Sequence, residues 1–258
     1  MPVVPLSGLG LPNLEIGPNL GPNDLQFLQS IYDGGLEKYE RRLVSVGLSG
    51  LDFVLDAGCG FGQWSLALSA TCGQVQGFDI DPQRIRVCCA IKSHLAIGNV
   101  EFGNADLKSL PVRSSLFDGV ICYSVIFLTQ YQPVLLELHR VLKPGGLFYL
   151  SANGIGRYVF EVLNPKRLGS DFDSRRYGMR TIFNSFIGRK DGFSIENGAQ
   201  VMSLARTCAT LRKIGFDVIG SGPEGSVGTQ PCPFFPPRYL GLPMSFDIIA
   251  RKRVVGKQ

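Results

Sequence analysis

The sequence predicts an α/β fold whose core is a mostly parallel, seven-stranded sheet with helices on both faces. From Asp52 to Ser151, short apolar runs of strand length alternate with segments of helical length, and this alternation implies right-handed crossovers and a parallel sheet. The stretch Val54-Leu-Asp-Ala-Gly-Cys-Gly-Phe-Gly62 is typical of a buried strand that enters a tight glycine turn. Two further strand-like runs, 215–219 and 245–250, follow near the carboxyl end.

The composition of the 258 residues fits a soluble globular protein with one sizeable core. Apolar residues make up 45% and charged residues 18% of the chain, which is unlike a disordered protein. No apolar run has the length needed to span a bilayer, and the amino-terminal stretch has no signal-peptide architecture. The seven cysteines form no CxxC pair and no metal-ligand spacing with the two histidines. We therefore expect reduced thiols, a cytoplasmic location and no metal site.

Four segments are expected along the chain, because composition and periodicity change at their borders. Residues 1–50 are expected to form a leader and a helical cap, and residues 51–153 the cofactor-binding core. Residues 154–198 are expected to form a basic insertion that covers the substrate. Residues 199–253 are expected to complete the core, with a loop rich in Pro, Gly and aromatic residues at 220–243.

Periodicity places the elements of the core. Pro82 fits the first turn of a helix, where the N–H groups have no intrahelical partner. The nearly continuous apolar run 117–123 is typical of a central parallel strand, and Lys143-Pro-Gly-Gly146 is predicted to form a turn. Strands are predicted over 53–56, 74–79, 100–103, 117–123 and 147–151. Helices are predicted over 63–70, 81–95, 131–142 and 199–214, and one or two helices, broken or bent at Gly34-Gly35, over 23–46.

The carboxyl ends of the strands are where an open α/β sheet binds its ligand. The glycine turn, Asp79 and Asp106 would meet there. A dinucleotide is disfavoured, because the third glycine of its fingerprint would have to stand at Gln63. Asp56, expected to face the pocket at the end of the first strand, favours a cationic ligand, since a carboxylate would repel a pyrophosphate.

These features resemble the class I S-adenosylmethionine (SAM) dependent methyltransferases. The resemblance covers about Asp52 to Ser151 and rests on Asp56 with the three glycines at alternate positions, on Asp79 some twenty residues later, and on Leu138-His-Arg-Val-Leu-Lys-Pro-Gly-Gly146. It implies a Rossmann-like sheet with an antiparallel last strand, SAM as the cofactor, and in-line displacement of a methyl group. In that family a helical extension often covers the cofactor, which makes Tyr32 and Tyr39 candidates for contacts with it.

The resemblance also assigns roles to individual residues. Asp79 would accept the two ribose hydroxyls, since a carboxylate is an acceptor-only group. Ile80 would pack against the adenine ring, and Asp106 would accept a hydrogen bond from the adenine amino group. The expected cofactor-binding residues are Asp56, Gly58, Cys59, Gly60, Gly62, Asp79, Ile80, Ala105, Asp106, Leu107 and Tyr123.

Methyl transfer mainly requires that the acceptor is aligned and water is excluded. A general base is needed only where the acceptor carries a poorly acidic proton, so no catalytic residue is assigned. The candidates at the pocket mouth, each more readily a positioning or structural residue than a base, are Tyr123, Ser124, Asn153 and Tyr158.

The acceptor is expected to be a small molecule, namely a metabolite, sugar or glycoside that can be anionic. The reason is the segment from Arg157 to Lys190, which has eight basic and three acidic residues within a chain of net charge +5, together with the aromatic residues of the 220–243 loop. Two alternatives remain open: a tRNA or rRNA methyltransferase, with arginines on phosphates and aromatics on bases, and a non-catalytic SAM-binding protein. The oligomeric state is not predicted.

Overall fold

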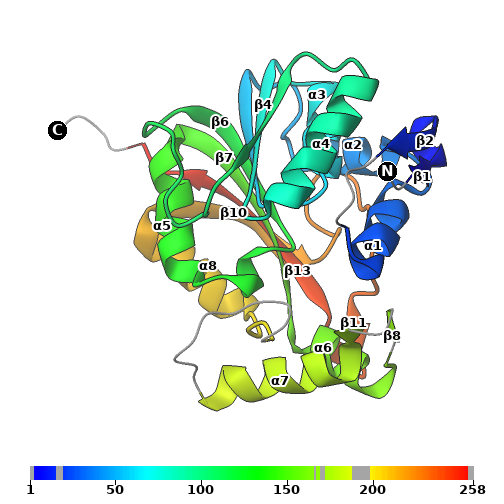
Figure 1. The fold of residues 1–258 in the computed structure, drawn as a ribbon. Helices are drawn as coiled ribbons and strands as arrows, with labels where there is room; N and C mark the ends of the chain where they lie inside the picture. The colour runs from blue at the N-terminus through cyan, green and yellow to red at the C-terminus, as the bar shows by residue number, and fades with distance from the viewer. Residues whose placement is uncertain (1–2, 16–19, 166, 169–171, 188–197, 255–258) are drawn as a thin grey trace.

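A computed structural model describes residues 3–15, 20–165, 167–168, 172–187 and 198–254, and its centre is a twisted seven-stranded sheet (Figure 1). The strands are β3 (Phe53–Ala57), β4 (Gln74–Asp79), β5 (Val100–Asn104), β6 (Phe117–Tyr123), β7 (Leu142–Asn153), β10 (Phe216–Pro223) and β13 (Ser245–Lys252). Their order is β10-β13-β7-β6-β3-β4-β5. Neighbours from β7 to β5 are parallel, whereas β13 is antiparallel to both β7 and β10. This confirms the predicted fold class, including the antiparallel last strand.

Helices cover both faces of the sheet, and alternate residues of β6 show why. Val120 and Cys122 belong to the apolar cluster that includes Leu138 and Leu211, whereas Ile121 points to the other face and packs with Trp64. One face is therefore covered by α5 and α8, and the opposite face by α2, α3 and α4 (Figure 1). The helices are α1 (Pro22–Tyr32), α2 (Glu37–Ser45), α3 (Gln63–Ser69), α4 (Pro82–His94), α5 (Tyr131–Val141), α6 (Ile155–Leu163), α7 (Ser174–Ile187) and α8 (Leu204–Ile214).

Local signals explain most helix boundaries. The Asp81 carboxylate accepts a hydrogen bond from the Gln83 N–H at 2.8 Å, and Pro82 occupies the first turn of α4, as predicted. The predicted helix 199–214 begins five residues later than expected, because the backbone of Gln200 and Met202 instead donates to carbonyls of Phe127 and Asn153. These tertiary bonds replace helical ones.

A second correction concerns Lys143-Pro-Gly-Gly146. The sequence predicts a turn before the strand, but β7 already begins at Leu142. Its pairing with β6 slips between Phe117 and Gly119, so the Pro-Gly-Gly stretch is accommodated as an irregularity inside the strand.

The remaining elements extend beyond the sheet. The amino-terminal leader forms a hairpin of β1 (Val3–Leu6) and β2 (Leu11–Glu15), with a short 3-10 helix over Ser7–Leu9 between the strands. Helices α6 and α7 pack against each other beside the carboxyl end of β7 and the amino end of β13 (Figure 1). The short strands are β8 (Arg167–Leu168), β9 (Phe172–Asp173), β11 (Arg238–Tyr239) and β12 (Leu242–Pro243), and a 3-10 helix spans Ile126–Leu128.

In the part of the chain that the structure describes, no helix has the length and apolar character needed to cross a membrane. The four segment borders expected from the sequence stay predictions. Of the predicted basic segment, Lys166, Arg189 and Lys190 lie outside the described residues.

Candidate functional site

The glycine turn after β3 forms the floor of the candidate site. Gly58, Gly60 and Gly62 all have a left-handed backbone conformation, with φ of +79°, +56° and +85°. Residues other than glycine adopt this conformation only with strain. The N–H groups of Gly58 and Cys59 both donate to the Phe78 carbonyl, at 2.8 and 2.9 Å. The turn is therefore tied to the end of β4.

The turn is open to solvent at one point. A Cβ atom added to Gly60 would meet no atom within 4 Å, whereas one at Gly58 would lie 2.7 Å from a methyl group of Val125. Gly58 thus allows the exit of β6 to pass close to the turn, and Gly60 leaves room for a ligand to approach its backbone.

Asp79 at the end of β4 stands next to this opening. Its carboxylate accepts from the Gly60 N–H and from the Asp81 N–H, both at 2.9 Å, and the residue is 6% exposed. Because a carboxylate has about four acceptor positions, it keeps capacity for two further donors. The next side chain, Ile80, is 70% exposed, which is unusual for a large apolar residue and gives the site an apolar wall.

The loop after β5 is joined to the same place. The Ala105 N–H and the Asn104 side-chain amide both donate to the Asp79 carbonyl, at 3.0 and 2.9 Å. Asp106 is half-buried and forms an ion pair with Lys108 at 3.2 Å, while Leu107 is buried. The structure therefore brings the predicted residues of all three strand ends together, and their contacts with a cofactor stay predictions.

Asp56 is placed differently from the expectation that it faces the pocket. It is 1% exposed, below the turn, and accepts from the Ser65 hydroxyl at 2.7 Å. Burial, with a contribution from the nearby Asp79 carboxylate, raises the pKa of Asp56 to about 7. Its carboxylate therefore lies beneath the turn and not on the surface that a ligand would contact.

The amino-terminal cap holds the other side of the turn. The buried Tyr32 hydroxyl donates to the Phe61 carbonyl at 2.7 Å, and Arg84 lies over the Phe61 ring while it pairs with Asp24 at 2.8 Å. Tyr39, the second tyrosine expected near the cofactor, instead packs on Trp64. The Gln63 side-chain oxygen, directly after the turn, is buried without a hydrogen-bond partner among the described residues.

The four weak catalytic candidates are held by other parts of the protein. The Tyr123 hydroxyl donates to Glu224 at 2.9 Å, and the Asn153 side chain accepts from Ser245 at 3.0 Å. Tyr158 is fully buried, with its hydroxyl 3.5 Å from the Gln200 carbonyl. Ser124 has φ of +58° and donates its N–H to the Ser151 carbonyl. These contacts are structural, and a catalytic role for any of the four stays a prediction.

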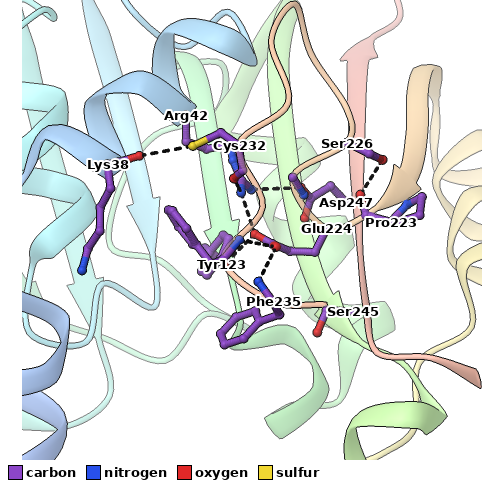
Figure 2. Close-up of polar contacts among 12 residues, drawn as sticks. Lys38, Arg42, Tyr123, Pro223, Glu224, Ser226, Cys232, Phe235, Ser245 and Asp247 are labelled. Atoms are coloured by element: carbon purple, nitrogen blue, oxygen red, sulfur yellow. Dashed lines mark hydrogen bonds and ion pairs between the residues drawn. The ribbon is translucent and has the colours of Figure 1, made fainter. Parts of the chain in front are cut away.

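A buried ionic network that no sequence pattern predicted holds Tyr123 (Figure 2). Arg42 on α2 pairs with Glu224 at 2.7 Å and with Asp247 on β13 at 3.0 Å, and it also donates to the Tyr149 hydroxyl at 2.7 Å. All four of these residues are at most 2% exposed. Burial raises the pKa of Asp247 to about 6, and it raises that of Tyr123 well above its ordinary value, with Glu224 adding to the shift.

The network also fixes the predicted aromatic loop. Glu224 accepts from the N–H groups of Phe234 and Phe235, at 2.9 and 3.3 Å, and Arg42 donates to the Cys232 carbonyl. Phe234 packs at 4.6 Å on the Arg42 guanidinium. Phe234 thus packs the α2 face of the core, whereas Phe235 lies against Arg157 of α6.

Comparison with known proteins identifies the core. Residues 54–146 match the family model of a methyltransferase domain. Demethylmenaquinone methyltransferases are 34% identical over 96 residues in Oceanobacillus iheyensis and 37% identical over 103 residues in Lactococcus lactis. These matches cover 36% and 38% of this chain and 40% of each relative, so this chain spans less than half the length of either relative that it matches.

Solved structures extend the likeness of the fold over most of the chain. A SAM-dependent methyltransferase from Aquifex aeolicus superposes with a TM-score of 0.57 at 18% identity, covering 90% of this chain and 98% of that one. A geranyl diphosphate methyltransferase reaches a TM-score of 0.60 at 13% identity, covering 90% of this chain and 83% of that one. Residues 54–146 therefore form a methyltransferase domain, and the chain has the fold of solved SAM-dependent methyltransferases.

Proposed function

We propose that the protein transfers a methyl group from SAM to a small organic acceptor. The observation that carries the proposal is the open space at Gly60, whose N–H donates to the Asp79 carboxylate, together with the exposed side chain of the next residue, Ile80. An acceptor-only group beside an apolar wall and an accessible backbone suits a nucleoside with ribose hydroxyls and a flat base.

The residues present fit SAM. Asp79 would hold the ribose hydroxyls with its unused acceptor positions, and Ile80 would cover one face of the adenine. Asp106, with the Ala105 and Leu107 amides, would bind the adenine edge. The unpartnered Gln63 oxygen offers a further acceptor directly after the turn. SAM supplies a methyl group on a positively charged sulfur, and the Asp56 carboxylate below the turn would stabilise that charge.

The chain's own contribution to methyl transfer is alignment. The turn is fixed by Phe78 from below and by Tyr32 from the amino-terminal cap, so the cofactor would be held rigidly while the acceptor approaches in line. Tyr123, as a neutral phenol bonded to Glu224, is suited to position an acceptor rather than to remove a proton.

A small-molecule acceptor is favoured over RNA by two observations. The relatives that match the core are named for demethylmenaquinone, a small quinone. In addition, Arg157 is already paired with Glu161 at 2.8 Å and stacked on Phe235, which leaves it less available to phosphates. A quinone or other metabolite ring is thus our first acceptor class, and a sugar or glycoside the second. All seven cysteines are free thiols, which supports a cytoplasmic enzyme as part of the proposal.

The proposal is tested with methyl-labelled SAM and three acceptor pools: quinones, glycosidic metabolites and bulk RNA. We expect label in the quinone or metabolite pool and none in RNA. The variant Asp79→Ala should lose both SAM binding and transfer, which excludes a contaminating activity. Label in the RNA pool alone would overturn the acceptor class, and SAM binding without transfer to any pool would favour the non-catalytic alternative.

A further inference from the structure

Helices α6 and α7 form an apolar groove on the outside of the molecule, away from the glycine turn (Figure 1). The groove has a volume of about 440 Å³ and is lined by apolar side chains of both helices. Four of them are strongly exposed: Leu163 at 55%, Met179 at 50%, Phe183 at 61% and Phe186 at 79%. A contiguous exposed patch of large apolar side chains indicates a surface that contacts something else.

The exposed residues of α7 form one stripe. Met179, Phe183 and Phe186 follow one another at spacings of four and three, which places them on the same side of the helix. Because successive residues are about 100° apart, Arg175 and Arg176 fall about 50° to either side of the stripe's centre. Both arginines are exposed. The stripe is therefore flanked by positive charge at the amino-terminal end of the helix.

The surrounding charge is predominantly positive. Helix α7 contains three arginines and no acidic residue. On α6, Arg157 and Glu161 neutralise each other in an ion pair of 2.8 Å. Asp173, just before α7, accepts from the N–H groups of Arg175 and Arg176 and offsets part of the charge. The described surface around the groove thus carries an excess of positive charge beside exposed aromatic and aliphatic groups.

We propose that this α6–α7 face docks on a lipid membrane surface that contains anionic lipids. Helix α7 would lie in the plane of the interface, with Phe183 and Phe186 in the acyl boundary and Arg175 and Arg176 at the headgroups. At 14 residues, α7 is too short to span a bilayer. A second copy of this chain fits less well, because both copies would bring an α7 helix with three arginines and no acidic residue to the shared interface.

The test measures co-sedimentation of the full chain with vesicles and does not depend on the proposed function. Binding to vesicles of equal parts phosphatidylcholine and phosphatidylglycerol should exceed binding to pure phosphatidylcholine at least about tenfold, and it should fall when the salt concentration is raised to 0.5 M. Equal binding to both vesicle types, or no binding, would contradict the proposal.

Variants locate the surface. The double variant Phe183→Ser/Phe186→Ser should reduce binding at least about tenfold, and Arg175→Gln/Arg176→Gln should remove most of the preference for anionic vesicles. Leu136→Ser on α5, which also replaces an exposed leucine (56%), is the matched control and should bind as the parent chain does. If this control weakens binding as much as the α7 variants do, the groove is not the docking site.

A third variant gives a positive signal and stays informative even if the serine variants misfold. In Phe183→Trp the new indole should shift its emission to shorter wavelength when anionic vesicles are added, whereas the native Trp64, which is 1% exposed, should not respond. Light scattering tests the other occupant: a dimer of the parent chain that Phe183→Ser/Phe186→Ser breaks would assign the groove to a second copy and overturn the membrane proposal.

Discussion

The cofactor-binding core and the outer part of the protein are stabilised in different ways. In the core, β3 and β4 pair across only about twenty residues, and the capping residue Asp81 bonds two positions further along the chain. Outside it, Arg42 contacts Tyr149, Glu224 and Asp247, which lie 107, 182 and 205 positions away. The comparison shows that a local pattern builds the SAM half, whereas a long-range ionic network attaches the aromatic loop and the amino-terminal helices to it.

Removal of Arg42, which connects the outer part to the core, should have the largest effect on stability. Arg42→Ala leaves the Glu224 and Asp247 carboxylates buried without their cation, and breaking a buried pair in this way costs about 3–5 kcal/mol. We expect the free energy of unfolding to fall by that amount in equilibrium urea denaturation. The exposed neighbour Arg41→Ala, whose pair with Glu37 is on the surface, should change it by less than about 0.5 kcal/mol. A loss below 1 kcal/mol for Arg42→Ala would mean that the network is not what joins the two regions.

Asp79→Ala should reduce SAM affinity about 100-fold or more, because two hydrogen bonds to a charged acceptor are lost at about 1.5–3 kcal/mol each. Since Asp79 also accepts from the Gly60 and Asp81 N–H groups, stability should fall by about 1–3 kcal/mol. Calorimetric titration well below the unfolding temperature measures the affinity. Asp52→Ala, an exposed carboxylate at the opposite end of β3, is the control. Unchanged affinity in Asp79→Ala would refute the ribose assignment.

The buried Asp56 predicts a pH dependence within the core. Its pKa rises from 3.8 to about 7 on folding, so the folded state holds the proton more tightly than the unfolded state. The stability contributed by this group is therefore greatest below about pH 4 and decreases as pH rises towards 7.

Asp56→Asn should remove that loss. It keeps an acceptor for the Ser65 hydroxyl, so we expect it to unfold like the parent chain at pH 4 and to be more stable at pH 8. Urea denaturation at the two pH values measures the difference. A variant that is destabilised equally at both would show that the carboxylate is charged throughout.

Tyr123→Phe should have the smallest effect. It removes one hydrogen bond to the Glu224 carboxylate, and a single bond to a charged group contributes about 1.5–3 kcal/mol. We expect this loss of stability and a SAM affinity within about twofold of the parent chain, measured by denaturation and calorimetry. A tenfold weaker SAM affinity would place the hydroxyl in the cofactor site and bring the two regions into direct contact there.

Much of the core could be predicted from the sequence, because its signals act over a few residues. The strand–glycine–helix stretch, the Asp81-Pro82 helix start and the apolar run of β6 each specify their own structure. Where the prediction was wrong, contacts with a distant segment decided the structure. Pairing with β6 makes β7 begin at Leu142, so Pro144 and Gly145 lie in an irregular part of the strand. Backbone hydrogen bonds to Phe127 and Asn153 make α8 begin only at Leu204.

The sequence by itself determined the sheet, the glycine turn and the set of strand-end residues that the structure brings together, since these follow from periodicity and backbone preference. Only the tertiary structure decided that Asp56 is buried below the turn, that Tyr123 is bonded to Glu224, and that Phe183 and Phe186 are exposed beside α6. The sequence around a carboxylate, a phenol or an apolar stripe does not specify whether the group is buried or what it contacts. Its burial and its partner depend on which distant segments fold against it.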